Sequence, residues 1–147
     1  GDDYLHDTFM KVVYIAKEML EREIAKAMEK VEGMKKVRLL LDTATDKRII
    51  IMEEPLPWER VLVPARQTLF VVYPRREGNW GAIGVPVAVS GFERKKLFPE
   101  AWGGKCDEEL QSISGVHDAV FCHRGRFIAT ALSKEGAIKL AHLALSS

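Results

Sequence analysis

The sequence predicts an α+β fold: a small mixed or antiparallel sheet packed by helices, with a long N-terminal helix. Short β-branched and aromatic runs bounded by turn residues occur between residues 48 and 131, as is typical of strands. Helical periodicity fills both ends of the chain, and the middle shows no regular βαβ alternation. A sheet with helices added around it follows from these two observations.

The first element is a helix over residues 4–31, because apolar residues recur at three- and four-residue steps and charges cover the opposite face. We expect the helix to end near Gly33. The apolar face consists of Leu5, Phe9, Val12, Val13, Ala16, Met19, Leu20, Ile24, Ala27, Met28 and Val31.

The length of this helix leaves two interpretations open. At about 1.5 Å per residue it is roughly 42 Å long, whereas a domain of this size is about 38 Å across. It is either a long core helix or a connector that packs partly on a neighbour. We therefore divide the chain into a helix over residues 1–33 and an α+β lobe over residues 34–147. Because the chain starts with Gly1 inside a helical pattern, we expect a piece of a longer protein.

The centre of the chain predicts three strands. They cover residues 48–52, 68–73 and 79–87, and a turn over residues 74–79 joins the last two in an antiparallel hairpin. A short helix is expected from Pro57 or Trp58.

The C-terminal third predicts a helix, a second hairpin and a final helix. The first helix covers residues 107–113 and ends at Gly115. Strands over residues 119–123 and 126–131 flank the two-residue turn Arg124-Gly125, and Ser133 caps a helix that runs to about Leu145.

Bulk composition excludes several classes. The formal net charge is only +1, so attraction to polyanions must come from local patches. No stretch approaches the ~18 apolar residues of a membrane span, and we expect no membrane partner. Two cysteines do not make a disulfide framework, which favours a reducing intracellular compartment: the cytoplasm, or the nucleus or mitochondrion in a eukaryote.

Known catalytic signatures are missing from the sequence. It has no phosphate-binding glycine loop, no zinc-protease motif and no nucleophile elbow. The four histidines are scattered, and no group of acidic residues has the spacing of metal ligands. We therefore expect no catalytic residue, no metal site and no cofactor within this chain.

Basic residues beside aromatic ones are the remaining candidates for chemistry. Arg94 and Lys95 lie between Phe92 and the pair Phe98 and Trp102, a pattern that can hold phosphates while bases stack. The alternative is that the three rings belong to the core and the charges solvate a loop. His123 and Arg126 form a second basic group beside the last hairpin.

Three stretches in order, FVVYPRREGNWGAIGVPV, GFERKKLFPEAWGGKCDEELQSISGVHDAVFCHRGRFIA and SKEGAIKLA, carry a family resemblance. Their specific parts are D-E-x-L-x-x-I-S-G from Asp107 to Gly115 and F-x-H-x-x-x-F-I from Phe121 to Ile128. Over residues 58–143 the chain resembles the C-terminal half of Myg-type (melanocyte proliferating gene) proteins, a branch of the DHH phosphoesterase superfamily.

The resemblance implies a two-lobed hydrolase with 3′–5′ exonuclease activity on RNA. An upstream lobe would bind Mn or Mg and catalyse, and this lobe would help to hold single-stranded RNA or nucleotides without being catalytic alone. The alternative is a protein-interaction or homo-oligomerisation module that uses the long helix. The candidate substrate- and phosphate-binding residues are Arg94, Lys95, Trp102, His123, Arg126, Thr130 and Ser133.

One departure from the family pattern concerns the last strand. Where the family has paired glycines, this chain has Ala129 and Thr130, whose Cβ atoms keep backbone N–H groups from approaching a phosphate closely. Ser133 and the first N–H groups of the final helix would remain available to an anion. We therefore expect a weakened anion grip at this junction.

Overall fold

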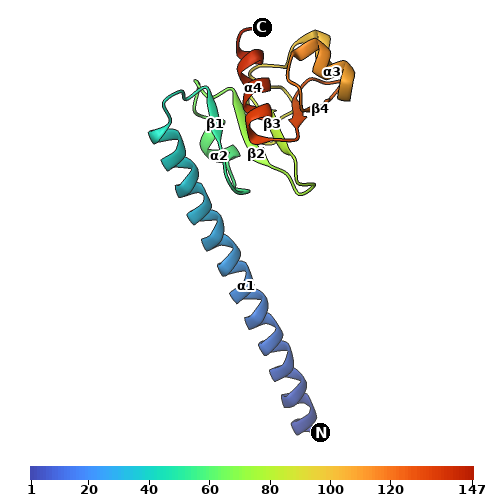
Figure 1. Cartoon of the computed structure of the whole chain (residues 1–147). Coiled ribbons are helices and arrows are strands. Elements are labelled where there is room, and N and C mark those ends of the chain that lie inside the picture. Colours follow the sequence, from blue (N-terminus) through green and yellow to red (C-terminus); the bar gives the residue numbers. More distant parts are fainter.

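A computed structural model describes residues 1–147 and shows an α+β fold built on one five-stranded sheet (Figure 1). The strand order is β1-β2-β3-β5-β4; β1 pairs parallel with β2, and all other neighbours are antiparallel. The strands are β1 (Ile49–Ile51), β2 (Phe70–Pro74), β3 (Trp80–Gly84), β4 (Ala119–Cys122) and β5 (Ile128–Ala131). The predicted fold class and the hairpin of β2 and β3 are confirmed.

Helices cover both faces of the sheet. They are α1 (Asp2–Thr43), α2 (Glu59–Leu62), the 3₁₀ helix η1 (Glu100–Trp102), α3 (Asp107–Ser114) and α4 (Lys134–Leu145). Because side chains alternate along each strand, β2 sends Phe70 and Val72 into a core with α3 and α4, and sends Val71 into a second core with α1 and α2. None of the helices combines the length and the hydropathy that a membrane span requires.

The end of α1 differs from the prediction. The helix continues through Gly33 to Thr43, where the Lys47 ammonium donates to the carbonyl oxygens of Leu41 and Asp42, 2.5 and 3.0 Å away. This helical position requires glycine, because a Cβ there would be 2.6 Å from the Pro57 ring. The glycine is needed for close approach of α1 to the lobe and does not end the helix.

The N-terminal three quarters of α1 project from the lobe (Figure 1). Every residue from 1 to 32 is exposed except the half-buried Met10. The interpretation as a core helix is therefore wrong for this part, and at about 1.5 Å per residue α1 is roughly 63 Å long. Exposed pairs such as Lys17–Glu21 and Glu18–Arg22 lie along it.

The caps of the last two helices follow the predictions, whereas the strand predicted over residues 79–87 ends at Gly84. Gly115 ends α3 with a φ of +75°, and Ser133 caps α4 by accepting from the Gly136 N–H at 3.0 Å. The last hairpin has a longer loop than predicted, because β5 begins at Ile128 and Arg126 adopts a φ of +60°. The division of the chain at residue 33 stays a prediction.

Candidate nucleic-acid interface

Along the strand direction the sheet has two ends, which differ in character and which we call its proximal and distal edges. We call the edge where β1, β2 and β5 end the proximal edge, because α1 runs antiparallel to β1 and projects past it (Figure 1). The opposite edge, at the end of β3, is the distal edge. The proximal edge carries Glu53, Arg75, Arg76, Trp80, Ser133 and Lys134, and the distal edge carries Arg94, Lys95, Trp102, His123, Arg126 and Phe127.

The predicted site residues are thus divided between the two edges. Ser133 lies at the proximal edge and Thr130 one residue before the end of β5. The other five lie at the distal edge, away from the projecting part of α1. The structure does not bring the seven side chains together in one site.

At the distal edge Arg94 and His123 both contact the Phe127 ring. The Arg94 guanidinium lies 5.2 Å from the centre of the Phe127 ring, and the His123 ring lies 4.5 Å from the same ring. His123 Nδ1 accepts from the Gly125 N–H at 2.8 Å, so its exposed Nε2 is the nitrogen left to meet solvent or a ligand. Arg126 donates to the Phe98 carbonyl at 3.1 Å.

The predicted phosphate ligand Lys95 is engaged within the fold. Its ammonium donates to the carbonyl oxygens of Leu62, Ala65 and Thr68 at 2.7–3.1 Å. Burial lowers the pKa of this amine. All three donors of the ammonium are used, so Lys95 holds the loop between α2 and β2, and a phosphate would have to displace these carbonyls.

The aromatic half of the predicted distal site lies in the core. Trp102 is 4% exposed and its ring stacks on that of Phe98 with centroids 6.0 Å apart. A base cannot reach this indole without opening the core. Phe92, in contrast, is 96% exposed. Phe98 and Trp102 therefore belong to the core, as the alternative interpretation of the three rings predicts, whereas Phe92 does not.

The start of α4 is already occupied by a carboxylate from the same chain. Asp118 Oδ2 accepts from the Ser133 N–H at 2.9 Å and from the Ser133 hydroxyl, while that hydroxyl accepts from Gly136 N–H. The carboxylate lies where an anion would meet the positive end of the helix dipole. Ser133 is therefore a cap with a resident acidic partner, and an external phosphate would meet charge repulsion there.

Thr130 is enclosed in the sheet. Its side chain is 1% exposed and its hydroxyl has no hydrogen-bond partner. It pairs with Gly81 on β3 and Phe121 on β4. A ligand reaches this hydroxyl only if the flanking side chains move, so the position contributes to packing in this conformation.

The proximal edge carries a basic and aromatic surface that the sequence reasoning did not select as a site. The Lys134 ammonium lies 6.0 Å from the centre of the half-buried Trp80 ring and pairs with Glu53. Beside it, Arg75 and Arg76 border a depression of about 490 Å³ that also contacts Tyr73. The hairpin turn R-R-E-G-N was a visible signal for this surface, but its position beside the start of α4 depends on the strand pairing.

The chain does not assemble a metal-binding group. No group of three or more His, Cys, Asp or Glu side chains lies close enough together to hold a metal ion. Cys106 and Cys122 are free thiols. Burial raises the pKa of Cys122 to about 11, which keeps it protonated and unsuited to nucleophilic attack.

Comparison with known proteins places these features in a family. The profile of the family described as uncharacterised protein family UPF0160, MYG1 exonuclease, matches residues 2–145. The chain belongs to this MYG1 family.

Individual MYG1 relatives agree with this assignment. The MYG1 protein of Dictyostelium discoideum is 32% identical over 106 residues, which cover 67% of this chain and 32% of the relative. The yeast MYG1 protein YER156C is 31% identical over 113 residues, 72% of this chain and 33% of its own length. The human MYG1 exonuclease is 33% identical over 88 residues, 60% of this chain and 23% of its own length. The match thus spans about a third or less of each of these relatives.

Proposed function

We propose that this chain is the substrate-binding lobe of a two-lobed, metal-dependent phosphoesterase of the DHH superfamily, which removes nucleotides from RNA in the 3′–5′ direction. Its membership of the MYG1 family supports the proposal, as do mammalian relatives named MYG1 exonuclease. The lobe binds RNA and does not cleave it alone. Mn or Mg belongs to the upstream lobe, since this chain offers no cluster of three ligands.

The shape of α1 supports an upstream lobe as partner. Its apolar stripe continues from Phe9 through Leu20 and Val31 to Met34, which packs on the lobe. A body packed on this stripe would stand beside the projecting helix and face the proximal edge of the sheet. In this arrangement the cleft between the two lobes is lined by Arg75, Arg76, Trp80 and Lys134.

The single observation that carries the RNA-binding role is this proximal surface. Two arginines and a lysine beside a partly exposed indole combine phosphate neutralisation with a ring on which a base can stack. At the proximal surface Arg75 pairs with the exposed Glu77 and Lys134 with the exposed Glu53, and Arg76 has no partner. The distal cations Arg94, Lys95 and Arg126 are instead held by donating to backbone carbonyls.

A binding titration tests this surface. Fluorescence anisotropy would follow a labelled single-stranded oligoribonucleotide between about 50 and 200 mM salt. We expect the Arg76→Gln, Lys134→Gln double variant to reduce the slope of log K against log salt by about 1.4, since each phosphate contact on a single strand contributes about 0.7.

The control is the double variant Arg38→Gln, Arg124→Gln, which removes two exposed charges without an ion-pair partner, one on α1 and one at the distal edge; in the test pair Arg76 likewise has no ion-pair partner, whereas Lys134 pairs with Glu53. The control variant should leave the slope unchanged. No RNA binding at low salt, or equal effects of the two double variants, would refute the proposed surface.

A second function has one observation in its favour, the exposed apolar stripe of α1. The stripe would also serve a protein-interaction module in which two copies of the chain associate through α1. Sedimentation velocity over a concentration series separates the two functions, because a monomer at all concentrations contradicts self-association.

A further inference from the structure

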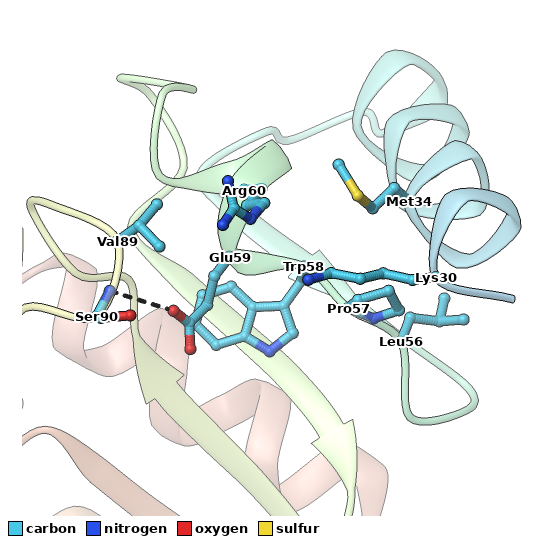
Figure 2. A pocket seen from close by; sticks show the side chains of 9 residues that line it. All are labelled: Lys30, Met34, Leu56, Pro57, Trp58, Glu59, Arg60, Val89 and Ser90. Atoms are coloured by element: carbon cyan, nitrogen blue, oxygen red, sulfur yellow. Dashed lines mark hydrogen bonds between the residues drawn. The ribbon is translucent and has the colours of Figure 1, made fainter. Parts of the chain in front are cut away.

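A pocket lies at the junction where α1 meets the lobe (Figure 2). Its volume is about 340 Å³, within the range of small-molecule sites. We call it the junction pocket; it is lined by Lys30, Met34, Leu56, Pro57, Trp58, Glu59, Arg60, Val89 and Ser90. None of the predicted site residues and none of the proximal-edge residues line it, so it is a separate site.

The walls of the junction pocket combine an aromatic ring with free positive charge. The half-buried Trp58 indole lies across it, and the Lys30 side chain extends from α1 toward that ring (Figure 2). Lys30 and Arg60 are exposed and have no ion-pair or hydrogen-bond partner in the structure, although many other cations along the chain do.

The single acidic residue in the pocket is turned to another partner. Glu59 Oε2 accepts from the Ser90 backbone N–H at 3.5 Å, on the side of the pocket away from α1 (Figure 2). The lining therefore carries a net charge of +1 from two cations and one carboxylate. Of the two cations, Lys30 reaches the pocket from α1 and Arg60 from α2 (Figure 2).

We propose that the junction pocket binds a nucleoside monophosphate group, with the base against Trp58 and the phosphate held by Lys30 and Arg60. Met34, Leu56 and Pro57 supply apolar surface for the ring, and the unpaired cations supply charge-assisted hydrogen bonds. The same chemistry is presented by a free mononucleotide and by the terminal nucleotide of an RNA strand.

Occupation of the pocket would connect two parts of the molecule. Lys30 and Met34 belong to α1, and the other lining residues belong to the lobe. A bound nucleotide adds contacts across the junction beside Gly33, where the helix touches Pro57. The ligand therefore fixes the direction in which α1 leaves the lobe.

The test is a titration of the 147-residue chain with AMP, followed by tryptophan fluorescence. We expect quenching that saturates in the micromolar to millimolar range, and weaker binding of adenosine and of inorganic phosphate. The Lys30→Gln, Arg60→Gln double variant should weaken AMP binding by about tenfold or more, since it removes both charged donors. Trp58→Leu should abolish the quenching.

The experiment includes a control variant and a parallel titration with a second ligand. Arg38→Gln with Arg66→Gln removes two exposed charges outside the pocket and should leave AMP affinity unchanged. A short oligoribonucleotide with a terminal phosphate, titrated in parallel, shows whether the source is free nucleotide or an RNA end.

Absence of AMP binding at millimolar concentration, or an unchanged affinity in the Lys30→Gln, Arg60→Gln variant, would overturn the inference. Because both substituted residues are exposed, loss of folding does not confuse this result. The RNA-binding function is tested separately by the RNA titration of the Arg76→Gln, Lys134→Gln variant, since those residues do not line the junction pocket.

Discussion

The two parts of α1 have similar sequences and opposite environments. From Gly33 to Thr43 the helix lies against the lobe, and Val37 is completely buried. From residue 2 to residue 32 it has the same spacing of apolar side chains, and yet Phe9 is 63% and Leu20 61% exposed. An amphipathic pattern thus reports that a helix face requires a partner. It does not identify that partner, which can be the domain itself or another body.

Amide hydrogen exchange should give the largest difference between these two parts. Amides between residues 5 and 30 depend on local helix stability, because no tertiary contact protects them. Amides of Val71, Val72 and Leu140 open only with the core. We expect exchange at least about a thousandfold faster in the first group, measured by NMR or mass spectrometry on dilute protein. Equal protection would mean that α1 is packed in solution.

A matched pair of substitutions compares one aromatic residue from each part. Phe98→Ala removes a fully buried ring that contacts Phe70 and Trp102, and should cost about 3–5 kcal/mol of the free energy of unfolding. Phe9→Ala should change that free energy by less than about 0.5 kcal/mol.

Urea unfolding followed by tryptophan fluorescence measures both values. A large loss of stability for Phe9→Ala would show that the projecting part of α1 contributes to the same cooperative unit as the lobe.

A substitution at the junction of α1 with the lobe should have a smaller effect than Phe98→Ala. Gly33→Ala adds a Cβ 2.6 Å from Pro57 Cδ and 2.9 Å from Pro57 Cγ. Overpacking costs about 1–3 kcal/mol, while alanine gains about 1 kcal/mol of helix propensity, so we expect a net loss near 1 kcal/mol. Glu29→Ala, four residues earlier and exposed, is the control. A stabilised Gly33→Ala variant would show that the helix moves away from Pro57 at no cost.

Most of the fold could be predicted from local signals. Strands, hairpins and helix caps are encoded by near neighbours in sequence, and Ser133 and Gly115 act as expected. Gly33 was misread as a helix end because its requirement comes from Pro57, 24 residues later and invisible to a local pattern. The extent of α1 could not be decided for a similar reason, since its packing depends on what else is present.

The candidate site was less predictable than the fold. Basic residues next to aromatic ones were taken together because they are near in sequence, but strand register decides which edge each one reaches. Lys95 meets three carbonyls from a loop about 30 residues earlier. The start of α4 is filled by Asp118, 15 residues before Ser133. These long-range partners decide which charges are free, and composition does not reveal them. The substrate-binding role of the predicted residues stays a prediction.

The contact of α1 with the lobe from Gly33 to Thr43 leaves the rest of the helix without lateral support. About 31 residues of the helix extend beyond this contact, or roughly 47 Å at about 1.5 Å per residue. A tilt of about 10° where the helix leaves the lobe would move its N-terminal end by about 8 Å over that length. A body packed on the projecting part of α1 would therefore be displaced by several ångströms when the helix tilts by a few degrees where it meets the lobe.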